Sequence, residues 1–322
     1  MTRLIAEFCQ NHNGDFHLLA KMVKAAAQAG ATHGKMQTIY VNTLTYRPQF
    51  EEGLVQDGIT KSIKRPYAEE CERLKRLEIS DEETIHFVEL CHDNGLIPMT
   101  TCFVRAHVDR LTSLGFSSIK VASYDCASFP LLRELAARFD EIVVSTGATH
   151  NDEVILAADS LRGTNFAMLH CVTLYPTPLD EMHMARMKWL RELAPAVGYS
   201  DHSLVSETGL IASKAALALG AELIERHFTL LPADETRDGP VSINAEQLRE
   251  LADFSQLSIK ERCSRLDHEY PEWKVVIGQK NRDLSDAELL NRDYYRGRFA
   301  SPREESVSGM RMVNNWEEVP LP

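Results

Sequence analysis

The chain has 322 residues, of which 44% are hydrophobic and 25% are charged, so it can form a sizeable core and intrinsic disorder is excluded. Its formal net charge of −12 argues against a nucleic acid or an anionic membrane as a partner. No stretch approaches the roughly 20 apolar residues that span a bilayer, and the first residues carry no long apolar run, so we expect a cytoplasmic protein. Seven cysteines without a C-x-x-C pair indicate reduced, structural thiols.

Short apolar runs of strand length alternate with helix-like segments along the chain. Such alternation is typical of parallel sheets built from βα units. Helix signals support it, since Ser80 begins a capping-box sequence, Asn94 and Gly95 end that helix, and Asn244 begins another. The strand-like runs are 4–9, 34–39, 97–103, 118–123, 142–147, 166–172, 197–201 and 223–229. Eight parallel strands close a barrel, so we predict an α/β fold of the (β/α)8, or TIM barrel, class.

Two regions interrupt the alternation. Residues 40–79 form a connection that is too long for an ordinary βα unit and contains two prolines, which indicates an insertion over the mouth of the barrel. Beyond about Leu266 the pattern gives way to Pro, Trp, Tyr and charged residues. We therefore predict a barrel domain over residues 1–265 and a linker-like C-terminal extension over residues 266–322.

Two lysines, Lys35 and Lys120, lie inside strand-like runs. A barrel strand is buried on both faces, so a lysine there faces a large desolvation cost unless it meets an anion. An ion pair with a carboxylate on a neighbouring strand explains one such lysine about as well as a ligand does. Two lysines near hydroxyl groups at strand ends favour a bound phosphate or carboxylate. The hydroxyl groups are those of Thr101, Ser123, Ser145 and Ser200.

His202 and His227 lie at the ends of the last two strands, which are neighbours in a closed barrel. Imidazoles that converge there can hold a divalent metal, with Asp201 and Glu225 as ligands or as partners of the ligands. A lone histidine is more often an ordinary core or surface residue. Because no third soft ligand is evident, we predict an Mn²⁺ or Mg²⁺ site rather than structural zinc.

Glu7 ends the first strand and precedes a turn at residues 11–14. Its carboxylate is either a structural hydrogen-bond acceptor that closes the first βα loop, or a general base or ligand of a substrate hydroxyl. Lys120 also allows a second interpretation, because a buried strand lysine with a lowered pKa can form a Schiff base.

Motifs in order along the chain resemble those of the sialic acid synthase family over roughly residues 3–260. They are Glu7 with 10–14, then 35–38, 120–123, 145–147, 169–171, 175–178, 198–202 and 225–229. The resemblance implies a homodimeric enzyme that condenses phosphoenolpyruvate with an open-chain N-acetylhexosamine. Phosphate is released and a nine-carbon 2-keto-3-deoxy sugar acid is formed.

The resemblance also implies roles for individual residues. His202 and His227 would bind the divalent metal, which polarises the sugar aldehyde. Glu7 would position the sugar or the attacking water, and Tyr175 would line the sugar pocket. The residues that would bind phosphoenolpyruvate are Lys35, Gln37, Thr101, Lys120, Ser123, Ser145 and Ser200.

Some positions depart from the family pattern. Asp125 stands where the family usually has Glu, and this shorter carboxylate must reach farther to the metal-bound water. Thr173 stands where the family usually has Asn, so a contact to the sugar would differ. Asp234 and Asp238 both match a site aspartate, and we prefer Asp238. The predicted catalytic residues are Glu7, Lys120, Asp125 and Tyr175, with Asp238 as a substrate ligand.

Family members commonly continue into a small antifreeze-like domain that supplies an arginine to the partner subunit's sugar. This sequence keeps a linker-like piece at 278–301, and Arg298, Arg303 or Arg311 could supply that contact in cis or across a dimer. A smaller or differently decorated acceptor is therefore a hypothesis.

Two other interpretations stay open. The first is a lysine-dependent aldolase or lyase, which predicts metal independence and borohydride trapping at Lys120. The second is a barrel that has lost activity and serves as a binding protein, although the retained Glu7, lysines and histidines speak against it.

Overall fold

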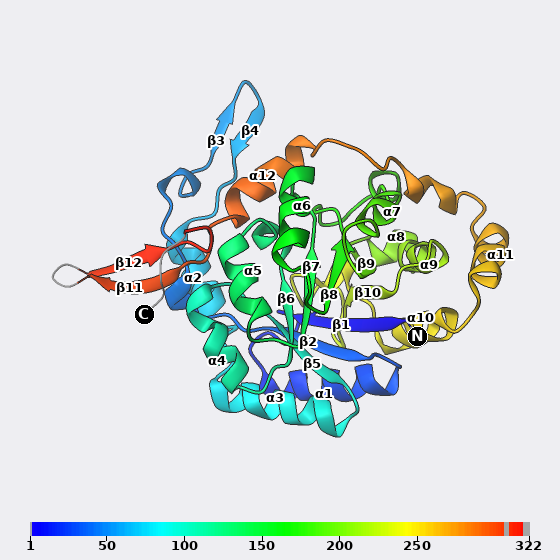
Figure 1. Ribbon diagram of the computed structural model, residues 1–322, viewed down its shortest axis with the longest axis horizontal. Coiled ribbons are helices and arrows are strands. Elements are labelled where there is room, and N and C mark those ends of the chain that lie inside the picture. The colour runs from blue at the N-terminus through cyan, green and yellow to red at the C-terminus, as the bar shows by residue number, and fades with distance from the viewer. Residues whose placement is uncertain (1, 306–308, 318–322) are drawn as a thin grey trace.

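The computed structural model describes residues 2–305 and 309–317. Its centre is a closed parallel barrel in which the strands neighbour one another in the order β1, β10, β9, β8, β7, β6, β5, β2 and back to β1 (Figure 1). The strands are β1 (Arg3–Cys9), β2 (His33–Gln37), β5 (Ile97–Thr101), β6 (Ser118–Val121), β7 (Glu141–Ser145), β8 (Phe166–His170), β9 (Ala196–Asp201) and β10 (Leu223–His227). Each predicted run contributes one strand, so the predicted (β/α)8 fold is confirmed.

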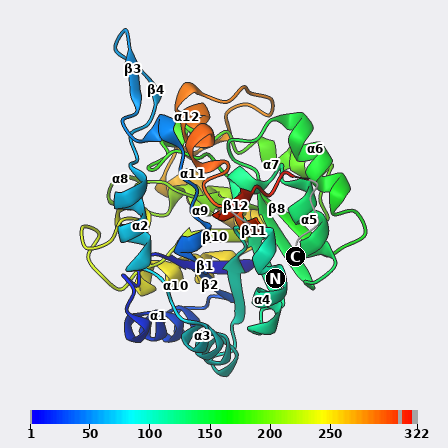
Figure 2. The same ribbon diagram turned by 90° about the vertical axis from the view of Figure 1, so that its left-hand side faces the viewer.

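A helix follows each barrel strand and covers the outside of the barrel (Figures 1 and 2). The capping box predicted at Ser80 is present, and Asn94 is the C-cap of that helix. The helix start predicted at Asn244 is also confirmed, and it too has a capping box. The covering helices are α1 (Phe16–Gln28), α3 (Asp81–Asp93), α4 (Val108–Ser113), α5 (Phe129–Ala136), α6 (Asn151–Ser160), α7 (Arg186–Leu190), α9 (Ile211–Ala218) and α10 (Ala245–Ser255). None of the described helices is both long and apolar enough to cross a membrane.

The inside of the barrel is filled toward the amino ends of its strands. An apolar layer is formed there by Ile5, Met99, Val143, Ala167, Leu169 and Leu223. Below it, Glu141 accepts hydrogen bonds from Ser118 Oγ at 2.6 Å and from Arg3, and lies 3.3 Å from the His33 ring. The apolar layer is buried, and the polar groups below it are paired with one another. The polar groups available to a ligand therefore lie at the other end of the barrel, where the strands finish.

The predicted insertion contains the hairpin β3 (Leu54–Gln56) and β4 (Ile59–Ser62), followed by α2 (Tyr67–Lys75). The hairpin projects away from the barrel beside helix α12 instead of lying over its mouth (Figures 1 and 2). Its base is closed where Arg65 N donates to Phe50 O at 2.7 Å. The part of the insertion that borders the barrel mouth is therefore the segment around Arg65 and α2.

The C-terminal part of the chain runs back across the barrel. It contains α11 (Ile259–Glu269) and α12 (Asp286–Tyr295), and α12 leads to the hairpin β11 (Ser301–Glu305) and β12 (Gly309–Val313). The short helix α8 (Val205–Thr208) belongs to the barrel, between β9 and α9. Trp273 and Val276 belong to the main hydrophobic core. Helix α11 spans the domain boundary predicted at residue 265, and that boundary stays a prediction.

Candidate active site

A cavity of about 410 Å³ opens where the barrel strands end. It gathers side chains that are far apart in sequence, because the carboxyl ends of all parallel strands meet at one end of the barrel. The predicted site residues that line it are Glu7, Lys35, Gln37, Thr101, Lys120, Ser123, Ser145, Tyr175, Ser200, His202, His227 and Asp238. Asp234, the alternative to Asp238, is an exposed residue outside the lining.

Two lysines and two carboxylates alternate at the floor of the cavity. Lys35 Nζ donates to Glu7 Oε2 and lies 3.9 Å from Glu225 Oε2. Lys120 Nζ lies 3.4 Å from Glu225 Oε1, and it donates to Ser145 Oγ at 2.7 Å. Each of these four charged side chains is less than a tenth exposed. The sequence left two explanations for a strand lysine, an ion pair with a neighbouring carboxylate or a bound anion. In the structure the same two lysines form the ion pairs and also line the cavity.

Burial sets the protonation of this floor. Desolvation lowers the pKa of Lys35 to about 7, with a further lowering by the charge of Lys120 that the charge of Glu225 opposes. Burial raises the pKa of Glu225, but the charges of Lys120 and Lys35 outweigh it and bring the value to about 2. Glu225 is thus a carboxylate at neutral pH, and its Oε2 has no hydrogen-bond partner in the described part of the chain.

Several hydroxyl groups line the same cavity as the two ammonium groups. Ser145 ends β7 and accepts the hydrogen bond from Lys120, while Ser200, near the end of β9, donates to Glu225 Oε1 at 2.8 Å. Ser123 Oγ accepts from Gly147 N at 3.2 Å, which fixes it at the start of a neighbouring loop. These donors, with the lysines, form a pocket floor suited to a phosphate or carboxylate.

His202 and His227 face each other with ring centroids 5.7 Å apart. His202 Nδ1 lies 3.1 Å from Val172 O, so it carries the proton and leaves Nε2 as an acceptor for Tyr175 Oη at 2.9 Å. Burial lowers the pKa of His202 to about 4 and also lowers that of His227, which keeps both imidazoles neutral. Neutral imidazole is the form that binds metal ions.

A third and a fourth donor lie beside His227. Ligand atoms of Cys9, His227 and Asp238 all lie within 4.8 Å of one another. Cys9 is the last residue of β1, and it has a left-handed φ of 46° next to a shift in the strand register, an uncommon conformation for a residue with a side chain. His227 Nδ1 is buried without a hydrogen-bond partner among the described residues. The donor set therefore fits a divalent cation.

Asp201, named as a possible metal ligand, is buried and pairs with Arg226, and it does not line the cavity. Asp125 is a second predicted residue outside the lining. It lies in the turn after β6, where its Oδ1 accepts a hydrogen bond from Asn315 Nδ2 at 3.2 Å. Burial raises the pKa of Asp125 to about 7. Asp125 thus joins the barrel to the C-terminal segment, and its catalytic role stays a prediction.

The cavity also has lining residues that sequence reasoning missed. Cys9 was interpreted as a structural thiol, and Glu225 only as a possible metal partner, although it bridges the two lysines. Arg65, Arg73 and Arg237 line the mouth and were not predicted at all.

Of the arginines proposed to supply a sugar contact, Arg298 lines the cavity and Arg303 does not, while the side chain of Arg311 lies outside the described residues. By contrast, the two lysines within strand-like runs, Lys35 and Lys120, did indicate from the sequence where the cavity lies.

The fold and this constellation of lysines, carboxylates and histidines define a (β/α)8-barrel enzyme. A family model described as the NeuB family matches residues 22–261. The chain is 30% identical over 317 residues to the N,N'-diacetyllegionaminic acid synthase of Legionella pneumophila, covering 96% of this chain and 82% of that protein. It is 27% identical to the pseudaminic acid synthase of Campylobacter jejuni, covering 96% and 86% of the two chains.

A solved structure of an N-acetylneuraminic acid synthetase from Leptospira borgpetersenii has the same fold, with a TM-score of 0.67 and 24% identity over 91% of this chain and 90% of that one. The chain belongs to the NeuB family, the family of the sialic acid synthases. It is accordingly a carbon–carbon bond-forming synthase. The family resemblance inferred from the ordered motifs is confirmed.

Proposed function

We propose that this synthase condenses phosphoenolpyruvate with an open-chain N-acetylhexosamine-type aldehyde, giving a nonulosonic acid and inorganic phosphate. One observation carries the proposal: a buried floor with two lysines lies in the same cavity as a pair of neutral histidines. The floor suits an anionic donor, and the histidines suit a cation that binds the carbonyl of an acceptor. The C3 carbon of phosphoenolpyruvate would bond to the aldehyde carbon, water would add at C2, and phosphate would leave.

The floor residues bind the donor in this proposal. Lys35 and Lys120 would exchange part of their contact with Glu7 and Glu225 for the phosphate and carboxylate of phosphoenolpyruvate. Ser123, Ser145 and Ser200 would donate to the same oxygens, and Thr101 and Gln37 border them. The removal of water from this buried floor strengthens every one of these electrostatic contacts.

Glu7 is placed between the donor and the acceptor. Its Oε1 accepts from Cys9 N at 2.7 Å, and its Oε2 accepts from Lys35, so both oxygens are oriented. When phosphate draws Lys35 away, Oε2 becomes available to orient the acceptor or the water that adds at C2. Tyr175 Oη, which donates to His202 Nε2, would release that nitrogen to the metal and border the sugar, while the contact of His202 Nδ1 with Val172 O would hold the imidazole in position.

His202 and His227 would hold the divalent metal, with Asp238 and Cys9 in reach as further ligands. The metal supplies a Lewis acid that polarises the acceptor aldehyde. The sequence favoured Mn²⁺ or Mg²⁺, but a thiol beside the site suits softer ions such as Zn²⁺ or Fe²⁺. That the enzyme is a cytoplasmic homodimer stays a prediction.

The test is phosphate release from phosphoenolpyruvate by purified protein loaded in turn with Mn²⁺, Mg²⁺ or Zn²⁺, against a panel of N-acetylhexosamines with chelator controls. Release that needs both a sugar and a metal supports the proposal. His202→Ala should lose the bound metal and the activity, whereas His33→Gln, a buried histidine at the amino end of the barrel, should keep both. Full activity in metal-free His202→Ala protein would contradict the metal assignment.

The Schiff-base alternative places different demands on Lys120. Its Nζ contacts Glu225 and Ser145, as an ammonium group would, rather than standing free in an apolar pocket. Treatment with borohydride in the presence of a keto acid, followed by mass spectrometry, separates the two reactions. A covalent adduct on Lys120 together with activity in chelator would favour the aldolase.

A further inference from the structure

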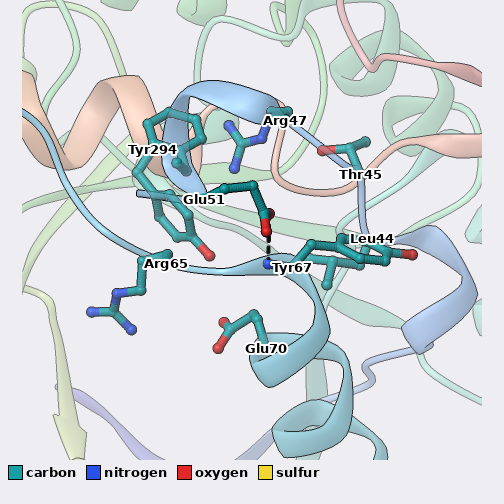
Figure 3. A pocket seen from close by; sticks show the side chains of 9 residues that line it. Leu44, Thr45, Arg47, Glu51, Arg65, Tyr67, Glu70 and Tyr294 are labelled. Carbon is teal, nitrogen blue, oxygen red and sulfur yellow. Dashed lines mark hydrogen bonds between the residues drawn. The ribbon is translucent and has the colours of Figure 1, made fainter. Parts of the chain in front are cut away.

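Four arginines surround one glutamate at the mouth of the cavity. Arg65 precedes α2, Arg73 lies within it, Arg237 follows β10 and Arg298 follows α12, and all four line the cavity. We call these residues and Glu70 the arginine cluster. Figure 3 shows Arg65, Tyr67 and Glu70 along the segment that enters α2, with Tyr294 approaching from α12. The cluster thus joins three separate parts of the chain.

The arginine cluster has more positive charge than its own partners neutralise. Arg73 donates to Glu70 from Nε at 2.8 Å and from Nη2 at 2.9 Å, and Arg298 donates to the same carboxylate. One carboxylate against four guanidinium groups leaves a net charge of +3 in a chain whose total charge is −12. Burial raises the pKa of Glu70, but these hydrogen bonds and charges lower it to about 2, so it cannot gain a proton near neutral pH.

Two of the arginines have no partner of opposite charge. Within residues 2–305 and 309–317, the side chains of Arg65 and Arg237 form neither an ion pair nor a hydrogen bond; the guanidinium group of Arg65 lies 5.7 Å from the centre of the Tyr294 ring. Partial burial and the neighbouring charges of Arg65 and Arg73 lower the pKa of Arg237. Arg298 is 7% exposed, and its Nε is buried without a hydrogen-bond partner in the same described part. Mutual repulsion of this kind is relieved when an anion binds.

The cluster is separate from the lysine floor but adjoins the candidate metal ligands. Lys35 and Lys120 sit on barrel strands and are paired with Glu7 and Glu225. Arg73 instead donates to Gln10 Oε1 at 2.5 Å, and Gln10 directly follows Cys9. A ligand that reaches from the metal site toward the mouth therefore meets the arginines, while the floor stays free for a second anion.

We propose that the arginine cluster binds a phosphate ester on the acceptor, at the end of the sugar remote from its aldehyde. This inference rests on the proposed function, because it orients the acceptor by its aldehyde at His202 and His227. A dianionic phosphate matches the charge of the cluster, and planar guanidinium groups donate to it in pairs. The enzyme would then prefer sugar 6-phosphates over the free sugars.

The experiment compares paired acceptors, each N-acetylhexosamine as the free sugar and as its 6-phosphate. We expect a KM roughly tenfold lower for the phosphorylated member of the productive pair, the size of one charge-assisted contact. Arg65→Ala and Arg237→Ala should each raise that KM several-fold and leave the KM for phosphoenolpyruvate unchanged. Arg76→Ala is the matched control, because Arg76 ends the same helix α2 but is exposed and pairs with Glu72.

Calorimetric binding of the sugar 6-phosphates without phosphoenolpyruvate separates this inference from the proposed reaction. Binding that Arg237→Ala weakens and Arg76→Ala does not supports the cluster even if no condensation occurs. Equal KM values for free and phosphorylated sugars, or the absence of binding in both assays, would overturn it. A raised KM for phosphoenolpyruvate in the arginine variants would also overturn it and assign the cluster to the donor.

Discussion

At the scale of single residues, burial changes what a side chain can do. Lys35 and Lys214 are both buried lysines, but Lys35 lies on β2 among charged groups of the cavity, whereas Lys214 lies on α9 and pairs with Glu250 at 2.6 Å. The pKa of Lys35, lowered to about 7 by burial, places its titration in the physiological range. An anion that binds at Lys35 favours its protonated form.

The affinity for phosphoenolpyruvate should therefore fall as pH rises through about 7, by up to roughly tenfold per unit, because binding must then bring a proton to Lys35. Calorimetric titrations from pH 6 to 9 measure this dependence. Lys35→Met should bind more weakly and lose this part of the pH dependence, while Lys214→Met should behave like the parent protein. The same pH profile in Lys35→Met as in the parent would contradict the assignment.

Asp125 gives a second residue-scale prediction, on stability. Its pKa is raised to about 7 in the folded protein, above an unfolded value of about 3.9, so the folded state holds the extra proton between these values. The free energy of unfolding should thus fall as the pH rises from about 4 to 7, because burial of the Asp125 side chain favours its protonated form. Thermal unfolding should show Asp125→Asn gaining Tm relative to the parent between pH 5 and 8.

If Asp125 is structural, its Asn variant should also keep its turnover within about threefold, because the amide can still accept from Asn315. A loss of a hundredfold or more would instead support the catalytic role that was predicted from the sequence. Asp109→Asn, an exposed carboxylate on α4, serves as the control for both measurements.

At the scale of elements, the insertion consists of two parts with different surroundings. The β3–β4 hairpin exposes Leu54, Val55 and Ile59 and contributes nothing to the cavity lining, whereas Arg65 and α2 border the mouth. Because Arg65 N and Phe50 O close the base of the hairpin, its tip can be removed without opening the rest.

Replacement of residues 53–61 by two glycines should leave kcat and both KM values within about twofold of the parent, since these residues do not line the cavity. Steady-state kinetics and a melting curve test this expectation. Arg73→Ala, in the part that borders the mouth, should raise the KM of the acceptor. A large loss of activity in the hairpin variant would show that the hairpin acts on the site.

The success of sequence reasoning also differed between elements. The barrel strands are largely buried on both faces, so they left short runs rich in apolar residues, and the helix between β2 and β5 carried its own capping box. The β3–β4 hairpin left no such run because its strands are three and four residues long and mostly exposed. The arginine cluster was invisible because its members come from the insertion, a loop and the C-terminal segment, and only tertiary packing joins them.

At the scale of the whole molecule, the C-terminal segment is part of the barrel's stability and of its site. Trp273 is 3% exposed within the main core and donates from Nε1 to Asp267 at 2.9 Å. Further along, Asn291, Tyr295 and Arg298 line the cavity. A segment that looked like a linker in the sequence therefore supplies both packing and site residues.

Trp273→Ala should lower the free energy of unfolding by about 3–5 kcal/mol, the usual loss for a large aromatic side chain removed from a core. Val275→Ala, an exposed neighbour in the same turn, should change it by less than about 0.5 kcal/mol. Urea denaturation of both variants measures the difference. Equal stabilities would mean that the segment folds independently of the barrel.

The filled amino end of the barrel has a kinetic consequence. The apolar layer around Met99 and the polar network of Glu141 block passage from below, so both substrates enter by the carboxyl end. The lysine floor lies deeper than the arginine cluster at the mouth. In the proposed reaction, a donor bound at the floor would have to arrive before an acceptor bound above it, so the order of addition would be compulsory. Acceptor in excess should then inhibit the reaction by trapping the enzyme without its donor.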